Sequence, residues 1–168
     1  IWVDDRSVMS GTGNSKSYSF NISQANGELK VVLAWSDERG SRFSSTQLVN
    51  NLDLEVTSPD GQTTYYGNDF SGGKSVNTGT RDSINNLEVV LIENAVQGVW
   101  TVKVVDTYHG GSKIQPYAVA VRGHGVNDLR PDITVITGDF AMSTEIPQVG
   151  EDVVVSVPFF NLGNVKAD

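Results

Sequence analysis

Side chains with oxygen atoms gather at the ends of three apolar segments of this 168-residue chain. Calcium takes six to eight oxygen ligands from carboxylates, Asn carbonyls, backbone carbonyls and water. Loops at one end of a β-sandwich can bring such segments together, and Asp37 and Glu38 could add a further carboxylate. We therefore expect calcium as a cofactor. Its candidate ligands are Asn50, Asn51, Asp53, Asn68, Asp69, Asp82, Asn85, Asn86 and Glu88.

Two other interpretations of the polar and aromatic residues stay open. Asn and Asp are also the usual turn residues, because their side chains hydrogen-bond to nearby backbone groups. Tyr65 and Tyr66 fall on opposite faces of one strand, and Trp2, Trp35 and Trp100 are spread along the chain. Exposed aromatic rings with polar neighbours would favour sugar binding, whereas tryptophans on strands more often belong to the core.

Catalytic chemistry finds little support in the residue types. His109 and His124 are the only side chains that titrate near neutral pH, and we expect both in loops between strands. No His, Cys and carboxylate cluster has zinc spacing, and no Ser occupies a nucleophile elbow. Cysteine is absent, which excludes disulfides and thiolate ligands. We expect this chain not to be an enzyme by itself.

The elements that would position these residues are short β-branched segments separated by Gly, Asn, Asp and Ser, a pattern typical of all-β proteins. The pattern predicts a jelly-roll or β-sandwich with Pro59-Asp60-Gly61 as a turn. We expect the continuously apolar Val89–Ile92 to be central in its sheet. The predicted strands are Ser17–Ile22, Glu28–Trp35, Leu52–Thr57, Thr63–Tyr66, Leu87–Ile92, Val99–Val105 and Tyr117–Arg122.

A change in composition divides the chain. We predict a β-jelly-roll domain at residues 1–129 and a shorter β extension at residues 130–168, which holds the strands Ile133–Ile136 and Val153–Phe160 and a turn at Pro147–Gly150. The formal net charge of −8 argues against nucleic-acid binding, which needs clustered Lys and Arg. No apolar segment is long enough for a membrane-spanning helix. Both ends look cut, so we expect a longer parent chain.

Four motifs in order resemble one family. They are Leu29–Asp37, Leu48–Val56, Tyr66–Asp69 and Asn85–Glu88, continued by Gly98–Val104 and Gln115–Val121. The series resembles the C-terminal β-jelly-roll (P-domain-like) domain that follows the catalytic domain of secreted subtilisin-like serine proteases. Residues 130–168 look like the first half of a CARDB-type Ig-like module. The family pattern has Asp where this chain has Asn51. Asn keeps an oxygen ligand but lacks the negative charge of Asp, so a calcium site here would bind the ion more weakly.

The resemblance implies a non-catalytic accessory domain that stabilises a secreted subtilisin-like protease, with calcium as the stabilising ion. Its partner would be the upstream catalytic domain of the same chain. The Gly-Thr-Ser-x-Ala-x-Pro nucleophile motif of that family is not found in these residues. The alternative is a binding module that targets the protease to polysaccharide, protein substrate or a cell surface.

Overall fold

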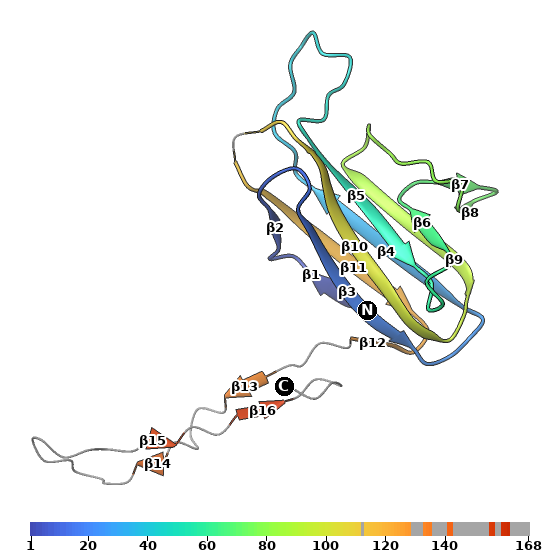
Figure 1. The fold of residues 1–168 in the computed structure, drawn as a ribbon, viewed down its shortest axis with the longest axis vertical. Helices are drawn as coiled ribbons and strands as arrows, with labels where there is room; N and C mark the ends of the chain where they lie inside the picture. The colour runs from blue at the N-terminus through green and yellow to red at the C-terminus, as the bar shows by residue number, and fades with distance from the viewer. Residues whose placement is uncertain (112, 129–132, 136–140, 143–154, 157–158, 162–168) are drawn as a thin grey trace, which may run out of the picture. The chain divides into compact units, whose positions relative to one another are not determined.

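The computed structural model describes residues 1–111, 113–128, 133–135, 141–142, 155–156 and 159–161. The chain forms two units, Ile1–Asp128 and Leu129–Asp168. Every regular element in the described ranges is a β-strand (Figure 1). No helix among the described residues is long and apolar enough to cross a membrane.

One sheet of the first unit has the strand order β1–β11–β4–β9, with β2 pairing with β11. All of its pairs are antiparallel. Its strands are β1 (Trp2–Asp4), β2 (Val8–Met9), β4 (Gly27–Trp35), β9 (Leu87–Ala95) and β11 (Gln115–Gly123).

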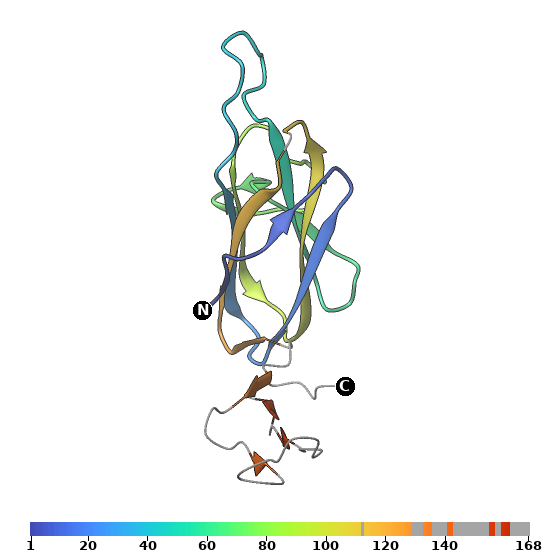
Figure 2. The ribbon, with the colours of Figure 1, turned by 90° about the vertical axis from the view of Figure 1, so that its left-hand side faces the viewer.

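The facing sheet has the order β12–β3–β10–β5–β6 and is also antiparallel. Its strands are β3 (Ser15–Ile22), β5 (Asn50–Thr57), β6 (Thr64–Tyr66), β10 (Gly98–His109) and β12 (Val126–Asp128). The longest strands alternate between the two sheets along the chain, as Figure 2 shows from the side. The prediction of an all-β sandwich is therefore confirmed.

The core lies between the two sheets and follows the two-residue period of the strands. Leu52, Leu54 and Val56 of β5 are fully buried, while Asp53 and Glu55 lie on the opposite face, as the alternating pattern predicts. Trp35 and Trp100 are core residues, which removes them as platforms for a sugar. Each indole N–H has a backbone carbonyl as its partner, since Trp35 donates to the carbonyl of Asn50 at 3.1 Å and Trp100 to that of Val96 at 2.9 Å.

Two expectations about local structure were wrong. β9 is an edge strand rather than a central one, and only Val90 and Ile92 of its apolar segment are buried in the core. Val89 and Leu91 are half-covered because the short hairpin β7 (Phe70–Ser71) and β8 (Lys74–Ser75) lies against this edge. His109 is the last residue of β10 rather than a loop residue.

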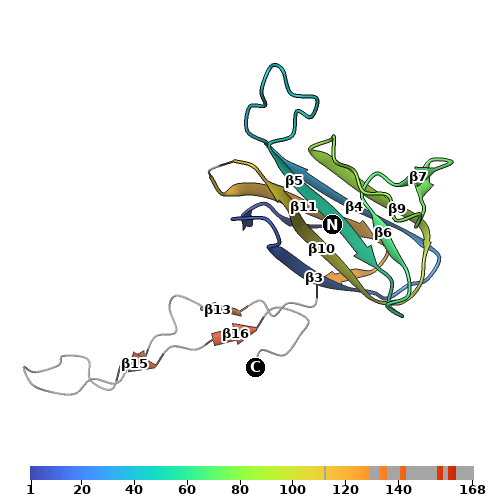
Figure 3. The same cartoon turned by 45° about the horizontal axis from the view of Figure 1, so that its top comes forward.

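Turns and loops set the ends of the sandwich. Gly61 takes a φ of +71° in the predicted turn between β5 and β6 and donates its N–H to the carbonyl of Ser58 at 2.9 Å. The segment between β4 and β5, residues 36–49, extends well beyond the strand ends (Figures 1 and 3, at the top). Its tip carries Phe43, which is 97% exposed.

The described residues of the second unit form two antiparallel pairs. β13 (Ile133–Val135) pairs with β16 (Phe159–Asn161), and β14 (Ala141–Met142) pairs with β15 (Val155–Ser156). β13 and β15 fall within the predicted segments Ile133–Ile136 and Val153–Phe160, β16 overlaps the end of the second segment, and β14 was not predicted. The predicted turn at Pro147–Gly150 lies outside the described residues, and the likeness to an Ig-like module stays a prediction.

Candidate functional site at the edges of the two sheets

A buried carboxyl group lies where the edges of the two sheets meet. Glu88, near the start of β9, is 1% exposed, and its Oε2 accepts the backbone N–H of Leu54 in β5 at 2.7 Å. Gly67 passes directly over this carboxyl group, so that a Cβ atom at position 67 would collide with Glu88. Glycine fits here because any other residue would force the Glu88 side chain to shift.

The environment of Glu88 disfavours its charge. Its Oε1 is buried and has no hydrogen-bond partner among the described residues. Burial raises the pKa of Glu88 to about 8, and the negative charges of Asp53 and Asp82 act in the same direction, against the N–H of Leu54 and the positive charge of Arg81. Glu88 is therefore largely protonated at neutral pH.

Asn68 joins the segment after β6 to the edge strand β9. Its backbone N–H donates to the carbonyl of Val89 at 2.9 Å, and its side-chain Oδ1 accepts the N–H of the same residue at 3.0 Å. Its Nδ2 donates to Asp82 at 2.6 Å and to the carbonyl of Leu87 at 2.8 Å. Asn68 adopts a φ of +60°, which Asn tolerates better than most residues.

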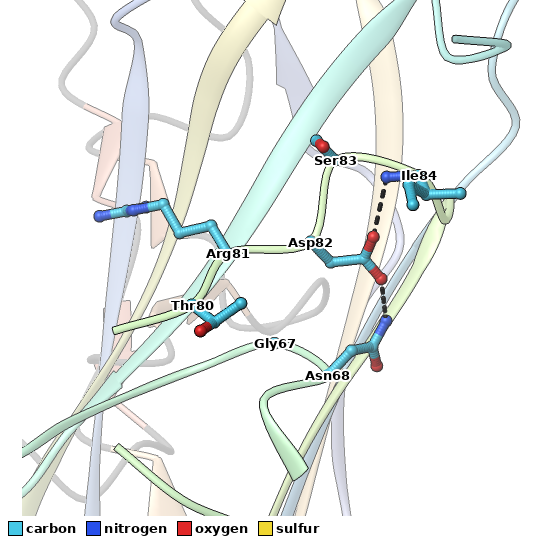
Figure 4. A pocket seen from close by; sticks show the side chains of 7 residues that line it. All are labelled: Gly67, Asn68, Thr80, Arg81, Asp82, Ser83 and Ile84. Atoms are coloured by element: carbon cyan, nitrogen blue, oxygen red, sulfur yellow. Dashed lines mark hydrogen bonds between the residues drawn. The ribbon is translucent and has the colours of Figure 1, made fainter. Parts of the chain in front are cut away.

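Asp82 is held by its own loop. Its two oxygens accept the backbone N–H groups of Ile84 and Asn85 and the side-chain amides of Asn68 and Asn85, at 2.6 to 3.1 Å. Figure 4 shows the bonds to Ile84 and Asn68. Burial by itself would raise the pKa of Asp82, but these hydrogen bonds outweigh burial and keep the pKa below its ordinary value. Asp82 is therefore ionised, and its hydrogen bonds to Ile84 and Asn85 fix the conformation of its own loop.

Arg81 points away from its neighbour Asp82 (Figure 4) and lies against the outer face of the second sheet. Its Nη1 donates to Asp53 at 2.6 Å and its Nη2 to Glu55 at 2.7 Å. The guanidinium also lies over the ring of Tyr66, 4.4 Å from its centroid.

We name the group Asp53, Gly67, Asn68, Arg81, Asp82 and Glu88 the polar junction. A pocket of about 230 Å³ opens on it.

The remaining predicted calcium ligands have other partners. The carboxylate of Asp69 accepts the N–H and hydroxyl of Thr78 at 2.8 to 2.9 Å. Asn50 donates to Gln115 at 2.9 Å and accepts the N–H of Gly111 at 3.0 Å. Asn51 donates to Asp53 at 3.0 Å and to the hydroxyl of Thr107 at 2.7 Å. Asn86 donates to the carbonyl of Trp35 at 2.9 Å.

The nine predicted ligands therefore do not meet in one calcium site. Asp53, Asn68, Asp82 and Glu88 share the polar junction, with Asn51 and Asn85 beside it, whereas Asn50, Asp69 and Asn86 belong to separate hydrogen-bonded groups. Across the described part of the chain, no three His, Cys, Asp or Glu side chains form a cluster fit for a metal ion. At the junction, Arg81 supplies the positive charge. The residues do not fit the shared site that we expected, and calcium binding itself stays a prediction.

The most important residue that sequence reasoning missed is Arg81. It bonds to a carboxylate 28 positions earlier in the chain, a separation with no local periodicity. Gly67 and Thr78 were missed for the same reason. The sequence signal was weak: the Arg-Asp pair at positions 81 and 82 lies among residues typical of turns.

His109 forms a second ionic group, at the far end of β10. Its Nδ1 lies 2.6 Å from Asp106, which is fully buried, and its Nε2 lies 2.7 Å from the carbonyl of Lys113. The hydrogen bond to Asp106 raises the pKa of His109 above its ordinary value, and the Lys113 carbonyl adds to this shift. Because both ring nitrogens face acceptors, neither is available to activate a serine.

Comparison with known proteins gave no matching family model. Two curated proteins from Dictyostelium discoideum are similar to the chain. The serine protease/ABC transporter B family protein tagA is 34% identical over 124 residues, which cover 70% of this chain and 7% of tagA. The serine protease/ABC transporter B family protein tagD is 32% identical over 92 residues, which cover 48% of this chain and 5% of tagD. The chain spans less than a tenth of the length of either relative. The similarity thus associates this all-β region with chains that are named for a serine protease.

Proposed function

We propose that the first unit is a non-catalytic accessory domain of a secreted subtilisin-like serine protease, and that it stabilises the parent enzyme. The observation that carries the proposal is the 34% identity with a protein named as a serine protease over 124 residues. The partner would be the catalytic domain upstream in the same parent chain, and the domain would act outside the cell.

The architecture supports a stabilising role. Both sheets contribute to one continuous core, so the unit can act as a rigid partner for a neighbouring domain. At the polar junction, Arg81 adds ion pairs to Asp53 and to the neighbouring Glu55. His109 supports a non-catalytic unit, because Asp106 and the Lys113 carbonyl already engage its two ring nitrogens.

The test compares the parent protease with a variant from which the region equivalent to residues 1–128 is deleted. We expect the deletion to lower the temperature at which peptidase activity is lost irreversibly, while the kcat of the surviving enzyme at low temperature stays close to that of the intact chain. Unchanged heat resistance would contradict the stabilising role. Peptidase activity of the isolated 168-residue chain would contradict the non-catalytic assignment.

A further inference from the structure

Two adjoining pockets flank the base of the projecting segment between β4 and β5. Their volumes are about 410 and 200 Å³, and both are lined by Ser44, Thr46, Leu48 and Tyr108. The larger one also reaches Asn51 and Ser83. We name the two pockets together the loop groove. Its combined size is in the range in which proteins hold small organic ligands.

Tyr108 presents an aromatic ring to this groove. The residue is 60% exposed, although it lies within β10. Its ring lies close against the backbone of Gly110, since a Cβ atom at position 110 would be 2.9 Å from Tyr108 Cε1 and 3.1 Å from its hydroxyl oxygen. Gly110 therefore gives the ring a place beside the backbone, with an apolar surface available to a ligand.

The lining of the groove carries no charge. Neither pocket is lined by an Asp, Glu, Lys, Arg or His among the described residues, although 19% of the whole chain is charged. An anionic ligand such as a phosphate would need cationic donors, and a metal ion would need carboxylates. The lining thus favours a ligand without net charge.

The polar groups of the groove have unused hydrogen-bonding capacity. Thr46 and Ser83 are exposed, and their hydroxyls make no hydrogen bond to another described residue. Asn51 adds no free group, because its Nδ2 donates to Asp53 and Thr107 and its Oδ1 is buried out of reach of a ligand. A ligand rich in hydroxyl groups offers donors and acceptors for Thr46 and Ser83.

The segment that forms one wall is held in place before any ligand arrives. The Asp37 carboxylate accepts the backbone N–H groups of Val49 at 2.7 Å and Asn50 at 2.9 Å. Further out, Gln47 donates from Nε2 to the carbonyl of Ser44 at 2.8 Å. A preformed wall reduces the ordering cost of binding.

We propose that the loop groove binds a neutral saccharide chain. One sugar ring would lie with its apolar C–H face against Tyr108, while its hydroxyls bond to Thr46 and Ser83. An aromatic ring beside uncharged hydrogen-bonding groups matches a sugar, which has an apolar face and a hydroxyl-rich rim. This goes beyond the stabilising role and does not depend on it, because ligand binding and heat resistance of the parent are measured separately.

The test uses the 168-residue chain on insoluble cellulose, chitin, starch, mannan and β-1,3-glucan, followed by calorimetric titration with the hexasaccharide of whichever polymer retains it. We expect retention on at least one of these neutral polymers. Tyr108→Ala should weaken binding at least tenfold, Tyr108→Phe should keep most of it, and Thr46→Val should weaken it severalfold.

Phe43→Ala is the matched control, because Phe43 is an aromatic residue of the projecting segment that is more exposed than Tyr108 but lines neither pocket. It should leave binding unchanged, and thermal melts should show that every variant is folded. Failure to bind any of the five polymers would overturn the proposal. So would an equal loss in Phe43→Ala and Tyr108→Ala, or binding that Tyr108→Ala leaves intact.

Discussion

Arg81 Nη1 lies 2.6 Å from Asp53 Oδ2, and this ion pair joins the loop before β9 to the outer face of the facing sheet. Asp53 is only 1% exposed, so its charge depends on this partner and on the hydroxyl of Thr107. The side chain of Arg81 is 41% exposed, which leaves the pair partly screened by water.

Arg81→Gln should destabilise the first unit, because it leaves the Asp53 carboxylate buried without its cation. Breaking a fully buried pair costs roughly 3–5 kcal/mol, and we expect about 2 kcal/mol here since water screens part of the interaction. Urea unfolding followed by tryptophan fluorescence measures the change. Arg39→Gln is the control, because the described residues offer Arg39 no ion pair. Equal effects of the two changes would refute a role for the Asp53 pair.

Glu88→Gln should remove a pH dependence of stability. The folded state holds the Glu88 proton up to a pKa of about 8, whereas the unfolded chain releases it near 4.5. The folded state therefore binds more protons in this window, and the free energy of unfolding falls as pH rises from 4.5 to 8, by at most about 1.4 kcal/mol per pH unit. Glu88→Gln should flatten that fall and should be the more stable protein at pH 8. Parallel pH curves for the two proteins would contradict the raised pKa.

His109 should add a second fall in stability, which begins near pH 6.5 and therefore overlaps the fall due to Glu88. Its pKa is raised in the folded state by Asp106, so its contribution is complete below the unfolded value of about 6.5 and is lost as pH rises through the folded pKa. NMR titration of the imidazole protons gives the pKa directly. Asp106→Asn should return it toward 6.5. A His109 pKa at or below 6.5 in the unchanged protein would show that the imidazolium is not favoured.

Gly67→Ala should destabilise the protein by about 1–3 kcal/mol, the usual cost of overpacking, because the added methyl group meets the Glu88 side chain. Chemical denaturation measures the loss. Gly11→Ala is the matched control, since its added Cβ would make only an ordinary 3.4 Å contact with Asn14 and its φ is not positive. A Gly67→Ala variant as stable as Gly11→Ala would mean that Glu88 moves away at little cost.

Calcium should leave the melting temperature nearly unchanged, because the nine predicted ligands lie in separate hydrogen-bonded groups and Arg81 already pairs with Asp53. The measurement is a thermal melt in excess EDTA and then in millimolar CaCl₂, with MgCl₂ as the control. A calcium-specific rise of several degrees would instead show that these side chains rearrange around the ion.

The strands could be predicted from the sequence because alternation along each strand is a local property. Leu52, Leu54 and Val56 take the predicted core positions, and the turn at Gly61 follows from local φ preferences. The edge position of β9 could not be predicted, because a continuously apolar segment looks the same whether a second strand or a hairpin covers it.

The candidate site was predictable only in part. The grouping of Asp53, Asn68, Asp82 and Glu88 follows from strand ends that meet at one side of a sandwich. The role of Arg81 depends on a bond between positions 53 and 81, and the need for Gly67 depends on a close approach to Glu88. Both are tertiary contacts that no spacing along the chain encodes.

The cover over β9 has a consequence for self-association. An uncovered edge strand presents free N–H and C=O groups to which a strand of another molecule can add. Here Asn68 uses both backbone groups of Val89, and the Ser75 hydroxyl accepts the N–H of Leu91 at 2.9 Å. Residues 67–76 therefore cover the outward-facing backbone groups of Val89 and the N–H of Leu91, which hinders edge-to-edge pairing of two molecules through β9.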